Sequence, residues 1–382
     1  MLVVRGYKYR IYPNKEQREY LNKTFGACRW IWNAMLADKI KHYEETGKSL
    51  KTSYASYKAD NTWLKEVDAH ALNFVQRDLE QAYKNFFRRL KNGEKPGFPK
   101  FKKRGRCRDS FKTRNTVGGN GLRIEGNRVK IPKLSTTVKM IVDRPIPDDA
   151  KICDATLSRT PSGEYYIAFC IEFKMKQKKG KSQSIGLDFS SRDYFVDNKG
   201  SIPDYPNYYK KSKERLAREQ RKLSHCQRGS KNYEKQRIKV AKVHQKIARQ
   251  RAYFAHNLSR KIARDNKIIA VEKLKLQEMM KQNKEKEGFL NRTKKNFNSA
   301  ITDIGYFNFC QMLAYKAEEY GHKYVQVNTF FPSSKTCHKC EHVIEENILS
   351  EKTFVCPVCG YKEDRDINAA KNILKEGKRL VN

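Results

Sequence analysis

Four cysteines near the C-terminal end place the strongest constraint on what this chain can fold into. Cys337 and Cys340 are separated by two residues, Cys356 and Cys359 are separated in the same way, and fifteen residues lie between the two pairs. This spacing is typical of a four-cysteine zinc site, because a two-residue gap lets both thiolates of a pair reach one tetrahedral ion. Four thiolates fill the coordination shell, so we expect a structural Zn²⁺. Gly360, directly after the second pair, favours a tight turn there.

The remaining cysteines show no metal-binding pattern. We interpret them as small buried or incidental residues; they are Cys28, Cys107, Cys153, Cys170, Cys226 and Cys310. The alternative for the four-cysteine motif is a set of unrelated buried cysteines, which the spacing makes much less favourable. His338 and His342 lie close to the motif, but the thiolates are the expected ligands.

The chain carries a large excess of positive charge. It has 382 residues, with 81 Lys and Arg against 42 Asp and Glu, a formal net charge of +39. The length predicts two or three domains, and 11% aromatic residues argue against a disordered basic tail. This composition indicates a folded protein that binds nucleic acid over a large surface. A ribosomal-type protein and a peripheral membrane protein are the alternatives.

A membrane or secreted protein fits the sequence poorly. No stretch approaches 18 consecutive apolar residues, and the apolar run near Met1 is too short for a signal-peptide core. We therefore expect no membrane partner and a place in the cytoplasm of a prokaryotic cell, associated with the nucleoid.

Hydrophobic periodicity predicts the secondary structure of both halves. In the first half we expect a strand at 2–12, helices at 14–47 and 60–91, a basic Pro/Gly-rich loop at 95–106, and strands within 120–174 that include a hairpin at 126–127. The cationic segment 174–181 marks a domain boundary. In the second half we expect strands at 184–189, 194–196, 267–274 and 323–328, a basic helical section at 208–265, a mobile loop at 277–298, and helices at 303–319 and 367–376.

Three carboxylates stand out because acids are scarce in this chain. Asp188 and Glu272 lie in apolar strands, and Asp366 lies at the expected start of the last helix. A buried carboxylate is costly unless it is paired or binds a metal. Together the three are able to hold two Mg²⁺ ions about 4 Å apart, an arrangement that hydrolyses phosphodiesters. Taken singly, each carboxylate also has an ordinary explanation. Asp188 fits a turn at a strand end, Glu272 fits an exposed strand face, and Asp366, like Asp364, fits a helix cap.

The order of these motifs carries a resemblance that spans nearly the whole chain. Gly-Leu-Asp-Phe is followed by Ala-Val-Glu-Lys-Leu, the cysteine pairs and Asp-Arg-Asp-Ile-Asn-Ala-Ala-Lys-Asn-Ile. The first half contains Tyr-Lys-Tyr-Arg-Ile-Tyr-Pro from Tyr7, Asn33 in a Trp/Ala-rich helix, and Lys-Pro-Gly-Phe-Pro-Lys-Phe-Lys from Lys95. The chain resembles the TnpB family of RNA-guided nucleases, which are encoded by insertion sequences and related to compact type V CRISPR effectors.

The resemblance implies a multidomain α+β fold. A β-barrel wedge domain would comprise 1–12 and 119–180, interrupted by a helical recognition domain at 13–118. A RuvC-like nuclease domain of the RNase H fold would comprise 181–334 and 361–382, with a zinc ribbon inserted at 335–360.

The resemblance also implies the catalytic residues. The family's metal-binding carboxylates fall on Asp188, Glu272 and Asp366, with Mg²⁺ or Mn²⁺ as the catalytic metal. Asp366 is preferred to Asp364 because the family's aspartate stands two residues before the Asn of Asn-Ala-Ala. Phe189 follows Asp188 where many relatives have Gly, but the carboxylate itself is present.

The implied activity is guided cutting of DNA. The protein would bind a guide RNA derived from the transposon end, read a short motif beside its double-stranded DNA target, and cut with one site, as one monomer per RNA. Base pairing would read most of the sequence. The residues expected near the target-adjacent motif are Tyr54, Lys58, Gln76, Arg77 and Lys84, although ordinary helix surface explains each equally well. Helices at 208–265 would line the heteroduplex channel or form a solvated face, and the loop at 277–298 would cover the site.

Four other functions stay open from the sequence. A compact type V CRISPR effector would share every motif. A non-cleaving RNA-guided DNA-binding regulator is expected to lose one of the three carboxylates, and this chain has all of them. A zinc-ribbon nucleic-acid-binding protein would carry them by coincidence. A direct transposase is less favoured, because no Tyr or His constellation marks a strand-transfer site.

Overall fold

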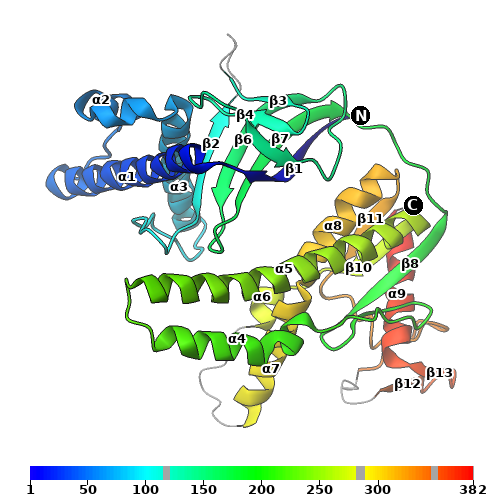
Figure 1. Ribbon diagram of the computed structural model, residues 1–382. Coiled ribbons are helices and arrows are strands. Elements are labelled where there is room, and N and C mark those ends of the chain that lie inside the picture. The colour runs from blue at the N-terminus through cyan, green and yellow to red at the C-terminus, as the bar shows by residue number, and fades with distance from the viewer. Residues whose placement is uncertain (115–120, 281–288, 346–351, 382) are drawn as a thin grey trace. The chain divides into compact units, whose positions relative to one another are not determined.

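The computed structural model describes residues 1–114, 121–280, 289–345 and 352–381, with 276–277 and 289–296 as backbone alone (Figure 1). The chain forms two compact units, Met1–Met175 and Lys176–Asn382. Their boundary lies within the cationic segment 174–181, where a domain boundary was predicted. Among the described helices, none combines the length and the apolar character that a membrane crossing requires.

The first unit is built on a seven-stranded antiparallel sheet in the order β2-β6-β7-β1-β5-β4-β3. The strands are β1 (Leu2–Tyr12), β2 (Asp109–Arg114), β3 (Arg123–Glu125), β4 (Arg128–Lys130), β5 (Val138–Ile141), β6 (Lys151–Arg159) and β7 (Tyr165–Lys174). Alternate residues of β1, including Tyr7, Tyr9 and Ile11, are buried. The predicted strand at 2–12 and the hairpin at 126–127 are confirmed.

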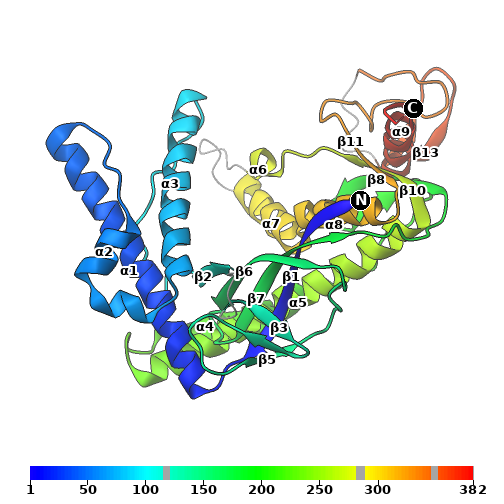
Figure 2. The ribbon, with the colours of Figure 1, turned by 90° about the horizontal axis from the view of Figure 1, so that it is seen from above.

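Helices of the first unit are α1 (Lys15–Thr46), α2 (Tyr54–Asp60) and α3 (Ala69–Lys91), with a 3₁₀ turn at Thr62–Glu66. Figure 2 shows α1 and α3 extending away from the sheet, and the two helices contact each other. Asn14 and Gln17 form a capping box that starts α1, and Gly47 ends it in the left-handed region. The predicted helix at 14–47 is confirmed.

Two expectations for the first unit differ from the structure. The helix predicted at 60–91 begins only at Ala69, because Asp68 accepts a hydrogen bond from the N–H of His70 and caps a new helix. The segment expected to be helical, 13–118, also contains β2, which pairs with β6. Phe111 and Thr113 are buried by this pairing. The alternation is too short to stand out among the surrounding basic residues.

The second unit is built on a four-stranded mixed sheet in the order β11-β10-β8-β9. The strands are β8 (Gln183–Ser190), β9 (Tyr194–Asp197), β10 (Asn266–Glu272) and β11 (Lys323–Val327). β8, β10 and β11 are parallel, and β9 runs antiparallel to β8. The four strands predicted from the sequence are confirmed.

Helices cover both faces of this sheet. The helices of this unit are α4 (Tyr208–Ser224), α5 (Lys231–Asp265), α6 (Leu276–Met279), α7 (Phe289–Ile304), α8 (Tyr306–Glu319) and α9 (Arg365–Arg379). Along β10, Ile269 and Val271 pack in the cluster formed with α5 and α8, whereas Ala270 packs with Ile373 of α9. Because strand side chains alternate between faces, α9 therefore covers the face opposite α5 and α8.

The basic section at 208–265 is helical as predicted, and it forms two helices, α4 and α5, that lie side by side (Figure 1). The predicted mobile loop at 277–298 is wrong for its described part, which includes α6 and the start of α7. Ile301 and Ile304 of α7 are buried. Their helical spacing was not recognised in the sequence because the surrounding residues are rich in Lys and Asn. Residues 281–288, including Gly288, lie outside the described chain. The helix predicted at 303–319 begins after Gly305, whose φ is 64°.

Candidate functional site

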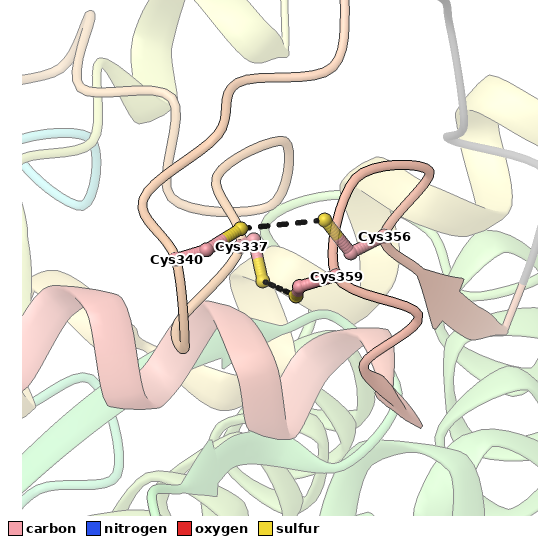
Figure 3. Close-up of side chains that lie close together, drawn as sticks. All are labelled: Cys337, Cys340, Cys356 and Cys359. Carbon is pink, nitrogen blue, oxygen red and sulfur yellow. Dashed lines mark hydrogen bonds between the residues drawn. The ribbon is translucent and has the colours of Figure 1, made fainter.

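The structure brings the four predicted cysteines together (Figure 3). The Sγ atoms of Cys337 and Cys359 lie 3.6 Å apart, those of Cys340 and Cys356 lie 3.5 Å apart, and all four lie within 4.8 Å of one another. A disulfide needs about 2.05 Å, so neither pair is bonded. Sulfurs around a tetrahedral Zn²⁺ with Zn–S bonds of about 2.3 Å lie roughly 3.8 Å apart. The cluster therefore fits a structural zinc ion.

Both cysteine pairs form the same turn. The N–H of Glu341 donates to the carbonyl of Cys337 at 2.9 Å, and the N–H of Gly360 donates to the carbonyl of Cys356 at 3.0 Å. Glu341 and Gly360 have φ angles of 63° and 67°. The tight turn predicted at Gly360 is confirmed, and its counterpart carries a glutamate in a conformation that favours glycine. Strands β12 (Thr353–Val355) and β13 (Lys362–Asp364) pair beside the second turn.

Two asparagines of α9 hold the cysteine module against that helix. The buried Asn368 amide donates to the carbonyl of Thr336 at 2.8 Å and accepts from the N–H of His338 at 3.0 Å. One turn later the Asn372 amide donates to the carbonyls of Ser333, at 2.9 Å, and Thr336, at 2.6 Å. These bonds satisfy buried backbone groups on both sides of Cys337. The module and α9 are therefore connected directly.

Parallel pairing places Asp188 beside Glu272. β8 and β10 are in register from Ile269 opposite Ile185 to Val271 opposite Leu187, and the next residue on each strand is the carboxylate. Neighbouring strands lie about 4.8 Å apart. Glu272 and Ala270 lie on one face of β10, so both carboxylates are on the face that α9 covers.

Two glycines let α9 lie directly on this face. A Cβ atom at Gly186 would lie 2.2 Å from the carbonyl oxygen of Ala370 and 2.8 Å from the Cβ of Leu374. A Cβ atom at Gly377 would lie 2.4 Å from that of Ala270. Gly186 and Ala270 are partners in the parallel pairing, so α9 crosses from β8, at Ala370 and Leu374, to β10, at Gly377. The first turn of α9 lies close enough to Asp188 for Asp366 and Arg365 to influence its carboxylate.

The helix start separates the roles of two aspartates. The side chain of Asp364 caps α9 by accepting from the N–H groups of Asp366, at 2.9 Å, and Ile367, at 3.2 Å. Asp366 is the first-turn acid, where the helix dipole favours negative charge. Its carboxylate pairs with the guanidinium of Arg365 at 3.0 Å and is 38% exposed. Asp364 is therefore occupied as a cap, whereas Asp366 is open to solvent.

The three carboxylates influence one another. Burial raises the pKa of Asp188 well above its usual value, the negative charges of Glu272 and Asp366 raise it further, and Arg365 opposes the rise. Burial also raises the pKa of Glu272. Among the described His, Cys, Asp and Glu side chains, only the four cysteines have all their ligand atoms within 4.8 Å of one another. The three carboxylates are close enough to influence one another, but their oxygens are farther apart than the sulfurs. Such a cluster of repelling acids is the environment that a divalent cation stabilises.

The five residues expected to contact nucleic acid lie on α2 and α3. Gln76 is already engaged, because its side-chain oxygen accepts from the N–H of Tyr54 at 3.0 Å and its amide donates to Glu80 at 2.9 Å. Arg77 and Lys84 are exposed, whereas Tyr54, Lys58 and Gln76 are partly buried. The structure thus places Tyr54 against Gln76, and nucleic-acid contact by the five residues stays a prediction.

Sequence reasoning missed the residues that build the site's frame. Gly186, Asn368 and Asn372 stand inside the quoted motifs but were given no structural role, and Gly377 was not considered, although all four determine how α9 meets the sheet and the cysteine module. The spacing of two asparagines four residues apart, on either side of a small Ala-Ala pair, was the available signal.

Three family models match this chain. Residues 306–373 match "Cas12f1-like, TNB domain", residues 168–283 match "Probable transposase", and residues 1–48 match "Helix-turn-helix domain". In the structure the last of these segments is a strand followed by one long helix, α1.

Relatives and a solved structure agree with these models. A Streptomyces pristinaespiralis protein named "Putative RNA-guided DNA endonuclease" is 30% identical over 98% of this chain and 90% of its own length. The Escherichia coli K12 protein "Putative RNA-guided DNA endonuclease InsQ" is also 30% identical, over 99% of this chain and 93% of its own. The protein in "Cryo-EM structure of the Cas12f1-sgRNA-target DNA complex" has a similar fold. The TM-score is 0.53 at 15% sequence identity, and the alignment covers 97% of this chain and 98% of that one. The chain belongs to the TnpB family of RNA-guided DNA endonucleases.

Proposed function

We propose that this protein is an RNA-guided DNA endonuclease of an insertion sequence, and that Asp188, Glu272 and Asp366 hold the metal ions with which it hydrolyses phosphodiester bonds. The observation that carries the proposal is the convergence of these three carboxylates, from two adjacent parallel strands and the helix packed across them. Their chain positions are far apart, so only the fold brings them to one end of the sheet.

The fold supports the domain assignment that goes with this function. The second unit, with its mixed sheet between helices, is the RuvC-like nuclease domain of RNase H type, comprising 181–334 and 361–382. The cysteine module at 335–360 is its inserted zinc ribbon. The wedge domain comprises 1–12 and 119–180, and the recognition domain comprises 13–118, with β2 adding a strand to the wedge sheet. Both belong to the first compact unit except for residues 176–180.

The side chains divide the chemical work among them. Divalent cations, Mg²⁺ or Mn²⁺, supply Lewis acidity and an activated water when they are bound. Asp188 and Glu272 offer oxygen ligands from rigid, paired strand ends. Asp366 offers a third from the first turn of α9, while Asp364 keeps that turn in place. The partial burial of Asp188 limits the access of bulk water to its carboxylate, which strengthens its interaction with a cation.

The remaining partners follow from charge and family. A guide RNA from the transposon end and a double-stranded DNA target present many phosphates, and a net charge of +39 neutralises a large share of them. Base pairing reads the target, while the protein reads a short adjacent motif, with Tyr54, Lys58, Gln76, Arg77 and Lys84 as its proposed contacts. One protein copy per RNA, acting in the prokaryotic cytoplasm at the nucleoid, completes the proposal.

Co-expression with the flanking genomic DNA tests this function. The purified protein is expected to retain a defined RNA, and the complex is expected to cut a plasmid that carries the matching target when Mg²⁺ is present. Asp188→Ala should abolish cutting while RNA retention stays unchanged. Asp204→Ala, which removes an exposed acid from the same unit, is the matched control and should cut normally.

Two outcomes would contradict the proposal. Guided binding to the target without cutting by the unaltered protein would indicate an RNA-guided regulator. Random RNA without guided activity would leave a basic zinc protein that binds nucleic acid. A compact CRISPR effector would instead retain an RNA transcribed from a CRISPR array.

A further inference from the structure

One exposed aromatic side chain stands beside the proposed site without a structural role. Phe330 is 83% exposed, more than any other large hydrophobic side chain in the described chain. It follows the carboxyl end of β11, the strand that pairs with β10 on the side away from β8. Val327, the last residue of β11, pairs with Glu272. Three residues span at most about 11 Å, so Phe330 stays close to the end of the sheet where the carboxylates lie.

The loop that carries Phe330 is fixed by hydrogen bonds. The N–H of Phe330 donates to the side-chain oxygen of Asn328, and the N–H of Phe331 donates to the carbonyl of the same residue, both at 3.0 Å. The Thr329 hydroxyl donates to the carbonyl of Lys273 at 2.6 Å, which joins the loop to the residue after Glu272. The exposure of Phe330 is therefore a property of an ordered loop.

The two phenylalanines of this loop have opposite surroundings. Phe331 packs against the cluster of Ala270, Val327 and Ile373, beneath α9. Phe330 meets solvent, and the ammonium of Lys275 lies 5.8 Å from its ring centroid. Isolated exposed hydrophobic residues are common on protein surfaces. A rigid ring beside a cation, next to a nuclease centre, is the arrangement that binds a single-stranded nucleotide, because the ring stacks on the base and the cation attracts the phosphate.

We propose that Phe330 stacks on a base of the single-stranded DNA that enters the carboxylate centre, with Lys275 facing that nucleotide's phosphate, so that the pair positions the strand for cutting. The inference rests on the proposed function, which supplies the single strand. Bases in a duplex are already stacked on each other, so an open ring face of this kind selects an unpaired strand.

Binding measurements test the stacking without relying on cleavage. The full chain with its RNA, in the Asp188→Ala background, is titrated with an oligonucleotide that carries 2-aminopurine, whose fluorescence falls when the base stacks. Phe330→Ala is expected to weaken binding about 5- to 100-fold and to abolish the quenching. Phe330→Trp should retain both signals, whereas Phe330→Leu should behave like Ala, since an apolar side chain without a ring cannot stack. Phe307→Ala is the matched control, because it removes another exposed ring, 63% exposed, from α8 of the same unit.

The outcomes separate this inference from the proposed function. If Phe330→Ala and Phe330→Leu bind the oligonucleotide as tightly and quench as strongly as the parent, the stacking proposal is overturned, even when guided cutting is intact. If quenching depends on Phe330 while no form of the protein cuts DNA, the stacking stands and the nuclease function fails.

Discussion

Replacing Gly186 by alanine tests whether contact between α9 and the sheet positions the carboxylates. The added Cβ would lie 2.2 Å from the carbonyl oxygen of Ala370 and 2.8 Å from both the N and the Cβ of Leu374. Two of these three atoms belong to the backbone of α9, so no change of rotamer relieves the contact. The helix or the strand must move by roughly 1 Å, which separates Asp366 from the strand carboxylates.

The size of the effect follows from this movement. Overpacking of this kind costs about 1–3 kcal/mol of folding free energy, a loss that leaves most of the protein folded. A misplacement of about 1 Å in an active site reduces turnover about 10²-fold. We therefore expect Gly186→Ala to lower the melting temperature modestly, to lower the rate constant for cutting at saturating target about 100-fold, and to leave guide RNA affinity unchanged.

The assay combines thermal unfolding with single-turnover cutting by the purified RNA complex. Gly26→Ala is the matched control, since Gly26 lies inside α1 and a Cβ atom added there would meet no described atom outside that helix within 4 Å. Alanine at this position favours the helix by up to about 1 kcal/mol. If Gly186→Ala melts and cuts like the unaltered protein, the close packing of α9 does not control the site, and the reasoning is refuted.

Two further predictions concern buried polar groups of the second unit. Asn368→Ala removes the hydrogen bonds to Thr336 and His338, so it should destabilise the cysteine module by about 1–3 kcal/mol. The release of Zn²⁺ to a colorimetric chelator should therefore be faster than in the unaltered protein. An unchanged rate of release would show that α9 does not support the module. Lys316 is buried, and burial lowers its pKa from 10.5 to about 8. Between pH 8 and pH 10.5 the Lys316 amine is therefore protonated in the unfolded chain but neutral in the folded protein, so the free energy of unfolding should rise with pH across that window. The Lys316 ammonium donates to the carbonyl of His256 and to the hydroxyl of Ser259, both at 2.7 Å. Lys316→Met removes these bonds together with the titrating group, so the rise in melting temperature between pH 8 and pH 10.5 should disappear; a rise that persists in the variant would contradict the role of the charge.

Local patterns predicted most elements of this protein correctly. The capping box at Asn14, the alternation in β1 and the two cysteine pairs involve residues that are neighbours in the chain, so their physical consequences are visible in the sequence. The same reasoning failed where a tertiary partner decides the outcome. β2 is a strand because β6 is there to pair with it, and α7 is a helix because Ile301 and Ile304 find a core.

The sequence by itself determined which chemical groups the protein has: four thiols at zinc-binding spacing, three acids in apolar or helix-start positions, and a charge suited to nucleic acid. Only the tertiary structure decided how those groups meet. Register between β8 and β10 sets Asp188 beside Glu272, and the absence of a Cβ at Gly186 lets α9 come near them. The end of β11 leaves Phe330 exposed near the same edge. These relations depend on contacts between segments far apart in the chain, and no local pattern encodes the distance between such segments.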